Sequence, residues 1–379
     1  MALALIGARI FDGAHLLEGR AVILDAERIA AVIPERELPA GIRVRRIDGL
    51  LAPGFIDVQV NGGGGVLFND QRDVAGIAAI GAAHRKYGTT GFLPTLITDT
   101  RDVMREAVAA ANAAIVEGVP GILGIHLEGP FLNPERKGVH DPKLMRAIEE
   151  EDIAIVTALK GGRAHLTIAP EKVPLAVIGR LAEAGVRISA GHSTASYEVM
   201  MAAKAAGLTG VTHLFNAMPP LAGREPGIIG AALNDGDLHA GLIVDMHHVS
   251  AASLRVAITA KGWERVMLVT DAMPSVGSNA PTFTIQGRVV TRHEGRLTTA
   301  DGTLAGSDLD MASAVRNTVE QLGLPLEAAL HMASRAPAEF LGLSDRYGRI
   351  AEGHRASLVL LDDRLNVRAT WIDGVGDDE

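Results

Sequence analysis

Four residues that could bind a metal ion or move a proton lie directly after short apolar runs of the sequence. They are Glu128, His192, His213 and Asp271. The glutamate and the two histidines supply one oxygen and two imidazole nitrogens, a set that suits a catalytic Zn²⁺ or a similar ion and leaves a fourth position for water. Beside such a water, the aspartate could take a proton and return it to a leaving group, or serve as a further metal ligand. This combination indicates metal-assisted hydrolysis.

No local metal motif such as HExxH is present, and any one of these histidines could instead be a hydrogen-bonded structural residue. A shared site is favoured because all four residues occupy the same position, at the end of an apolar run. His126 lies two residues before Glu128 and so shares its strand face. We interpret His126 as a packing residue or as a support for the ligands rather than as a catalytic group.

Eight short apolar runs recur through the middle of the chain, and alanine-rich amphipathic segments lie between most of them. This alternation is typical of βα units with a parallel sheet, and eight units predict an α/β fold, a closed (β/α)8 TIM-like barrel. The carboxyl ends of barrel strands meet at one mouth, which would bring the four polar residues together. The apolar runs are 55–60, 91–97, 122–127, 166–169, 186–190, 210–212, 242–244 and 266–269, and the helical segments include 101–115, 173–184 and 195–206.

Both ends of the chain have a different pattern, with short apolar segments separated by turns and no helical period. We therefore predict a small β-sandwich domain built from both termini, residues 1–52 together with 346–379. The metal-dependent barrel would occupy residues 53–345.

Composition excludes several classes of function. The 379 residues carry a formal net charge of −9 and only 3% aromatic side chains, which argues against binding to nucleic acid. The chain has no cysteine, which excludes disulfides, thiolate zinc sites and a cysteine nucleophile. Neither a signal peptide nor a membrane-spanning run is visible, so we expect a cytoplasmic protein without membrane partners.

Several motifs follow one another in an order that resembles the N-acetylglucosamine-6-phosphate deacetylases of the amidohydrolase superfamily. The resemblance covers essentially the whole chain. The HLEGP, THLFNAM and GREPG segments are specific to the deacetylases, whereas PGFID marks only the superfamily. The motifs are PGFID at 53–57, HLEGP at 126–130, AGH at 190–192, THLFNAM at 212–218, GREPG at 223–227 and LVTDA at 268–272.

The resemblance implies roles for individual residues. Glu128, His192 and His213 would bind the metal, Asp271 would be the general acid/base, and His140 would stabilise the acetyl carbonyl as an electrophile. The substrate-binding residues implied are Val139, His140, Asn216, Ala217, Arg224, His248, Leu304, Ala305 and Gly306. Arg224 and His248 would lie near the 6-phosphate. Because His247 and His248 are adjacent, the assignment to His248 depends on the following Val249, and His247 would be solvated or support its neighbour.

The expected reaction is hydrolysis of the acetamide of an N-acetyl-D-glucosamine 6-phosphate, with a metal-activated water as nucleophile. Many amidohydrolases carry His-x-His after the first strand, where this chain has Gln59 and Asn61. We therefore expect one divalent ion per chain, Zn²⁺ in preference to iron, cobalt or manganese. In the family the arginine that matches Arg224 reaches the neighbouring subunit's substrate, which implies a homodimer.

Two other functions remain open at this point. A different amidohydrolase, such as a cyclic-amide hydrolase or a deaminase, would typically show His-x-His and often a lysine that bridges two metals. A non-catalytic relative would be expected to lose the metal ligands or the aspartate. A different amidohydrolase is disfavoured by the amides at Gln59 and Asn61 and by the GREPG segment. A non-catalytic relative is disfavoured because the ligand set and the aspartate are intact.

Overall fold

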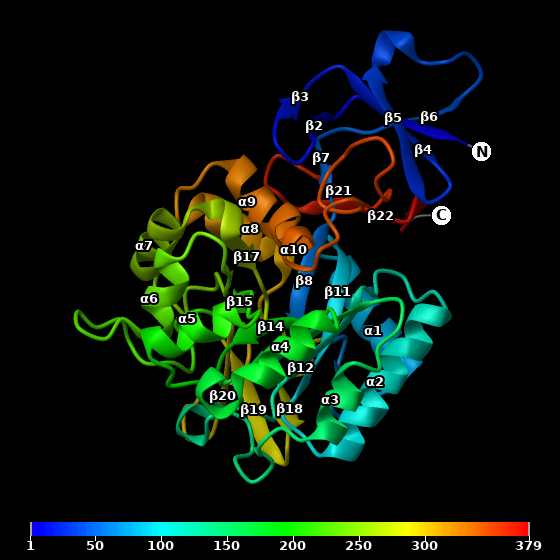
Figure 1. Ribbon diagram of the computed structural model, residues 1–379. Coiled ribbons are helices and arrows are strands. Elements are labelled where there is room, and N and C mark those ends of the chain that lie inside the picture. The colour runs from blue at the N-terminus through cyan, green and yellow to red at the C-terminus, as the bar shows by residue number, and fades with distance from the viewer. Residues whose placement is uncertain (1, 378–379) are drawn as a thin grey trace.

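The computed structural model describes residues 2–377, and its centre is a parallel eight-stranded sheet closed into a barrel (Figure 1). Neighbouring strands follow chain order, and the circle closes where the Asp271 N–H donates to the Gln59 carbonyl at 3.0 Å and Val60 pairs with Ala272. The predicted barrel is confirmed. Its strands are β8 (Phe55–Val60), β11 (Thr89–Ile97), β12 (Gly124–Glu128), β13 (Arg163–Ile168), β14 (Arg187–Ala190), β15 (Gly210–Val211), β16 (His239–Leu242) and β17 (Val266–Leu268).

Helices surround the barrel and bury their apolar faces against its strands. Several begin at a side chain that accepts a hydrogen bond from a backbone amide of the first turn: Asp73, Thr100, Ser196, Ser250 and Asp310. The helices are α1 (Val74–Arg85), α2 (Arg101–Val116), α3 (Glu150–Val156), α4 (Leu175–Glu183), α5 (Tyr197–Ala205), α6 (Gly227–Asn234), α7 (Ala251–Lys261), α8 (Met311–Glu320), α9 (Leu326–Ala333) and α10 (Arg335–Phe340). Short 3-10 turns lie at Glu35–Glu37, Pro134–Arg136, Pro170–Lys172 and Trp263–Arg265.

A smaller β domain is formed by both ends of the chain, which confirms the prediction of such a domain (Figure 1). One sheet has the order β5-β4-β1-β6 and the other β23-β22-β21-β7-β2-β3, so the C-terminal strand β21 pairs with the N-terminal β7. Trp371 is fully buried between them. The strands are β1 (Leu3–Ile6), β2 (Arg9–Phe11), β3 (Leu16–Leu17), β4 (Arg20–Asp25), β5 (Arg28–Pro34), β6 (Arg43–Arg46), β7 (Leu50–Pro53), β21 (Leu358–Leu361), β22 (Val367–Ile372) and β23 (Val375–Gly376).

A three-stranded antiparallel sheet between β17 and α8 was not predicted from the sequence. It consists of β18 (Thr282–Ile285), β19 (Arg288–His293) and β20 (Arg296–Thr299). The sheet lies at the end of the barrel remote from the small β domain (Figure 1). Its apolar face packs in a cluster with Ile97, Val139 and Met273, which come from the mouth of the barrel. A further short hairpin, β9 (Gly62–Gly63) and β10 (Val66–Leu67), follows β8.

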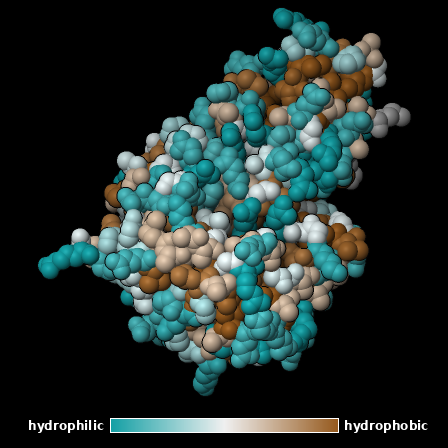
Figure 2. Space-filling model, in the orientation of Figure 1, coloured by the Kyte–Doolittle hydropathy of each residue, from teal (hydrophilic) through white to brown (hydrophobic). Residues whose placement is uncertain are grey.

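The outer surface shows two lobes, and hydrophilic residues cover much of the visible face (Figure 2). The segment between β15 and α6 projects from the side of the barrel at the left of Figure 1, and hydrophilic residues project at the same place in Figure 2. Within residues 2–377, no helix combines the length and the apolar character needed to cross a membrane.

Candidate metal centre and active site

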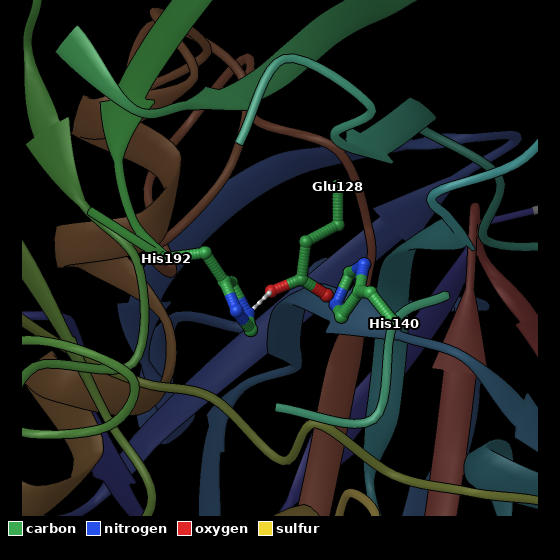
Figure 3. Close-up of side chains that lie close together, drawn as sticks. All are labelled: Glu128, His140 and His192. Carbon is green, nitrogen blue, oxygen red and sulfur yellow. Dashed lines mark hydrogen bonds and ion pairs between the residues drawn. The ribbon is translucent and has the colours of Figure 1, made fainter. Parts of the chain in front are cut away.

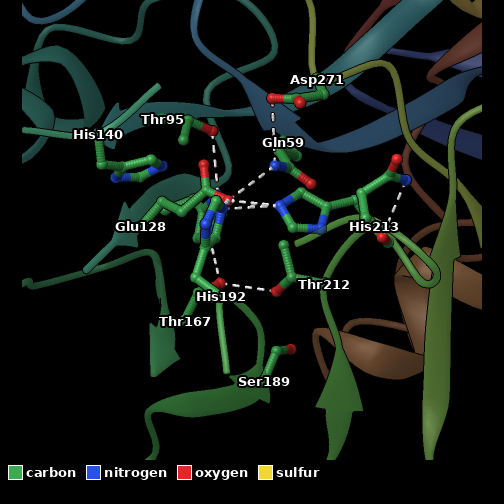
Figure 4. A network of polar contacts seen from close by, with 12 residues as sticks. Gln59, Thr95, Glu128, His140, Thr167, Ser189, His192, Thr212, His213 and Asp271 are labelled. Atoms are coloured by element: carbon green, nitrogen blue, oxygen red, sulfur yellow. Dashed lines mark hydrogen bonds and ion pairs between the residues drawn. The ribbon is translucent and has the colours of Figure 1, made fainter. Parts of the chain in front are cut away.

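Glu128, His192 and His213 converge at the carboxyl ends of β12, β14 and β15 (Figure 4). The Nε2 atoms of His192 and His213 lie 3.2 and 2.9 Å from Oε1 of Glu128, and 3.1 Å from each other. Ligands at Zn–N and Zn–O distances of about 2.0–2.1 Å in a tetrahedral site lie about 3.3 Å apart. The three atoms therefore have nearly the spacing of one face of a coordination tetrahedron, and the donor set fits a divalent ion.

A fourth potential ligand, His140, lies beside this cluster. One ligand atom each of Glu128, His140 and His192 lie within 4.8 Å of one another (Figure 3). However, Nδ1 of His140 is 2.8 Å from Oγ1 of Thr98 and 3.3 Å from its backbone nitrogen. The closer contacts of His213 favour it over His140 as the third ligand.

Backbone contacts orient the ring of His192. Its Nδ1 lies 2.8 Å from the carbonyl oxygen of Arg136, so Nδ1 carries a proton and donates to that carbonyl, while Nε2 faces the cluster. Metal-binding histidines commonly have such a partner on the second nitrogen. Nδ1 of His213 is buried and has no hydrogen-bond partner within residues 2–377.

Asp271 faces the cluster from the end of β17 and is held by the two residues that replace His-x-His. The amides of Gln59 and Asn61 donate to Oδ1 of Asp271 at 3.2 and 2.6 Å, and Gln59 also donates to Oε1 of Glu128 at 3.3 Å. In this arrangement both amide groups act as hydrogen-bond donors to carboxylates. They do not form a second cluster of metal ligands.

Burial and neighbouring charges shift the acidities of these groups in different directions. Although burial disfavours its charge, hydrogen bonds with His192 and His213 hold the pKa of Glu128 well below its usual range. Burial, together with the negative charge of Glu128, raises the pKa of Asp271 to about 6. Burial and the neighbouring His192 lower the pKa of His140 to about 3, so its ring is neutral. The site thus combines an anionic ligand, a neutral imidazole and a carboxylate near its titration point.

Four of the site residues have left-handed backbone conformations, which are rare for residues other than glycine. The φ angles are +48° at His192, +30° at His213, +52° at Ala217 and +53° at Asp271. Strained conformations of this kind cluster at functional sites, where surrounding structure holds them in place.

His126 lies below the cluster, inside the barrel. Its Nδ1 is 3.1 Å from Oγ1 of Thr95, its Nε2 is 2.8 Å from Oγ1 of Thr167, and its ring stacks on His165 with centroids 4.1 Å apart. Burial lowers its pKa to about 4, so the ring is neutral. Its contacts are those of a packing residue in the barrel core.

A cavity opens above Glu128 and Asp271, and most of the predicted substrate-binding residues line it. Sequence reasoning did not assign Ile97, Gly138, Met273 and Thr303 to this site, although all four line the cavity. The lining residues that were predicted are Glu128, Val139, His140, His192, His213, Asn216, Ala217, His248, Asp271, Leu304 and Gly306, and Asn61 lies among them.

Two predicted substrate residues lie elsewhere. Ala305 is fully buried in the cluster beneath the three-stranded sheet and does not line the cavity. Arg224 is exposed on the projecting segment between β15 and α6, and it forms no ion pair or hydrogen bond within residues 2–377. The chain does not bring Arg224 to its own cavity.

The two adjacent histidines after β16 have separate surroundings. Nδ1 of His248 lies 2.6 Å from Oδ2 of Asp245, whose other oxygen accepts from the His248 N–H at 2.9 Å, and the ring lines the cavity. His247 lies outside the cavity lining, and its Nδ1 accepts a hydrogen bond from Nε of Arg296 at 3.1 Å.

Known proteins resemble this chain in both sequence and fold. The profile of the Amidohydrolase family matches residues 50–375, and that of the NagA composite domain matches residues 3–51. The chain is 45% identical over 330 residues to the N-acetylgalactosamine-6-phosphate deacetylase of Shewanella sp. (strain ANA-3), covering 87% of this chain and 84% of that one. It is 37% identical to the N-acetylglucosamine-6-phosphate deacetylase of Haemophilus influenzae, over 99% of each chain. The crystal structure of N-acetylglucosamine-6-phosphate deacetylase from Pasteurella multocida matches with a TM-score of 0.95 at 33% identity and covers 100% of both chains.

Proposed function

Because the chain belongs to the amidohydrolase family and, within it, to the N-acetylglucosamine-6-phosphate deacetylases, we propose that it hydrolyses N-acetyl-D-glucosamine 6-phosphate to D-glucosamine 6-phosphate and acetate. The observation that carries this proposal is the meeting of three ligand atoms, 2.9–3.2 Å apart, with the carboxylate of Asp271 in one cavity.

Glu128, His192 and His213 would hold one divalent ion, with Zn²⁺ favoured by the nitrogen and oxygen donors. When bound, such an ion lowers the pKa of water and polarises a carbonyl group. We expect no second ion, because the amide N–H groups of Gln59 and Asn61 donate to Asp271 where a second pair of metal ligands would otherwise stand.

Asp271 would carry the proton. The oxygen of water forms a bond to the acetyl carbon, and Asp271 accepts the proton that this water loses. As the carbon–nitrogen bond then breaks, Asp271 returns the proton to the amine, and acetate leaves. A carboxyl group whose pKa is about 6 can accept and release a proton near neutral pH.

His140 would stabilise the negative charge that develops on the acetyl oxygen. Its Nδ1 accepts from the backbone N–H of Thr98, so the proton of the neutral ring is on Nε2 and is available to the substrate. A hydrogen bond that strengthens as the oxyanion forms lowers the barrier more than it stabilises the substrate.

The phosphate would be bound at the other end of the cavity. His248 lines this cavity and is oriented by Asp245, and Asn216 and Ala217 lie beside it. We place Arg224 in the site of a neighbouring subunit of a homodimer, because in its own chain it is exposed and unpaired within the described residues. A phosphate ester is charged and does not cross a lipid bilayer unaided, so the enzyme would act in the compartment that holds this substrate, which we propose is the cytoplasm.

The 4-epimer is a second candidate substrate, because the relative that is 45% identical is named an N-acetylgalactosamine-6-phosphate deacetylase. Acetate release from each 6-phosphate, with unphosphorylated N-acetylglucosamine as the control, tests both. Asp271→Asn, purified in the same way, controls for contaminating enzymes. We expect acetate from at least one 6-phosphate. No turnover of either 6-phosphate would instead leave a different amidohydrolase or a non-catalytic relative.

A further inference from the structure

The three-stranded sheet β18–β20 contacts the active site through the side chain of Gln286. Gln286 and Gly287 form the two-residue turn between β18 and β19. Oε1 of Gln286 accepts a hydrogen bond from the backbone N–H of Asp141 at 2.9 Å, and its Nε2 donates to the carbonyl of Thr98 at 2.8 Å. One side chain thus joins the loop that carries His140 to the end of strand β11.

Both of the joined residues control the position of His140. Asp141 is its neighbour in the chain, and Thr98 contacts its Nδ1 through both the hydroxyl group and the backbone nitrogen. On the other side of the loop, Val139 packs in the apolar cluster that includes Ile285. The orientation of the His140 ring therefore depends on the separation between Thr98 and Asp141, which Gln286 fixes.

The turn itself does not require glutamine. The next turn of the same sheet, Glu294–Gly295, also has two residues, and its φ angles of +48° and +76° equal those of Gln286 and Gly287. Glu294 is exposed, and its only ion pair within the described residues is with His293 at 4.0 Å. What distinguishes Gln286 is the pair of hydrogen bonds that its side chain makes.

We propose that Gln286 is a positioning residue for the deacetylation, acting through His140. This inference rests on the proposed function, in which His140 donates to the acetyl oxygen. A displaced donor weakens an interaction made in the transition state more than one made in the bound substrate. Gln286→Ala should therefore lower kcat by roughly 10- to 100-fold and change KM by less than about twofold.

The matched control is Glu294→Ala, which places alanine in the same backbone conformation without removing a contact to the site. We expect wild-type kcat for this variant. In a His140→Asn background, adding Gln286→Ala should change kcat by less than about twofold, because its effect passes through the ring that is already lost. If the melting temperature of Gln286→Ala lies well below that of Glu294→Ala, the measurements are repeated on Gln286→Met, which retains the side-chain volume.

Two kinetic results would overturn the proposal: a kcat for Gln286→Ala equal to that of the control, or an equal fall in kcat with and without His140. Hydrogen–deuterium exchange of residues 137–145 in the metal-loaded protein tests the same contact without turnover. Exchange should be faster in Gln286→Ala than in Glu294→Ala. If the wild type releases no acetate, the proposed function fails, and this exchange experiment alone decides whether Gln286 holds the loop, with equal exchange in both variants counting against it.

Discussion

Asp271 lies where burial penalises its negative charge, and its neighbours determine which oxygen can exchange a proton. The amides of Gln59 and Asn61 donate to Oδ1, so Oδ2 is the oxygen left for proton transfer. Burial and the charge of Glu128 raise the pKa of Asp271 to about 6, close to the pH at which the proposed reaction would have it accept and release a proton.

The first prediction concerns this carboxyl group. Asp271→Asn retains an oxygen that can accept from both amides but removes the base, so kcat should fall by roughly 10²- to 10⁴-fold. Metal content and melting temperature should remain those of the wild type, which shows that the loss lies in the chemistry. Turnover within about threefold of the wild type would assign the proton transfer to another group.

Residue types at strand ends were enough to predict that Glu128, His192 and His213 would lie together, because the barrel brings such positions to one mouth. Thr98 and Gln286 could not be found in this way. Gln286 bonds to backbone groups, which carry no side-chain signature, and the residues it joins lie 145 and 188 positions away.

At the scale of elements, a buried aspartate connects the first and last strands of the barrel. Oδ1 of Asp57 on β8 accepts from the Gln59 and Thr270 N–H groups at 3.1 and 3.3 Å, and its other oxygen contacts the Thr270 hydroxyl after β17. Burial, only partly offset by these hydrogen bonds, raises the pKa of Asp57 from 3.8 to about 7. The folded protein therefore favours protonated Asp57.

The second prediction follows from that shift. Stabilisation by Asp57 is complete below its ordinary pKa of 3.8 and is lost as the pH rises to about 7. Asparagine resembles the protonated acid, so the free energy of unfolding of the wild type should fall relative to Asp57→Asn across this window, by up to about 4 kcal/mol. Denaturant unfolding at several pH values measures the difference.

The control for this experiment is Asp363→Asn, since the side chain of Asp363 is 95% exposed. Its stability should follow that of the wild type at every pH. Parallel curves for the wild type and Asp57→Asn would mean that Asp57 is ionised in the folded protein.

Element boundaries were predicted well where an apolar run coincides with a strand, as at Phe55–Val60. The seventh run was placed at 242–244, whereas β16 is His239–Leu242, because His239 and Gly241 interrupt the apolar pattern and pairing with β15 and β17 sets the strand. The sheet β18–β20 was missed because few of its side chains are buried, chiefly Ile285, Val290 and Leu297, and their partners are distant in sequence.

At the scale of the whole molecule, the exposed Arg224 is the feature that one chain leaves unexplained. The third prediction is that it binds the phosphate in a partner's cavity. Arg224→Ala should raise KM for the 6-phosphate by roughly 10- to 100-fold, the effect of losing charge-assisted hydrogen bonds, and leave KM for the unphosphorylated sugar unchanged. Steady-state kinetics on both sugars measure this, and equal effects on the two would exclude a phosphate role.

Purified hybrid dimers show whether the Arg224 that completes a site comes from the partner or from the same chain. A hybrid of Arg224→Ala with Asp271→Asn should contain one complete site and about half of the wild-type activity. A hybrid of a wild-type chain with a chain that carries both substitutions should contain no complete site. Both hybrids are assayed at substrate concentrations well below the KM of Arg224→Ala. The reverse pattern would place Arg224 in the site of its own chain, and a monomer in solution would exclude the trans arrangement.

The most direct test of the central claim follows acetate release from N-acetyl-D-glucosamine 6-phosphate while Zn²⁺ is added to chelator-treated protein. The site offers one cluster of three ligands, and the amides of Gln59 and Asn61 donate to Asp271. We therefore expect the activity to rise linearly and to reach its plateau at about one equivalent of metal per chain. Full activity after chelation or a plateau at two equivalents would contradict a single-metal enzyme. No acetate at any metal loading, from this sugar or from its 4-epimer, would contradict a deacetylase.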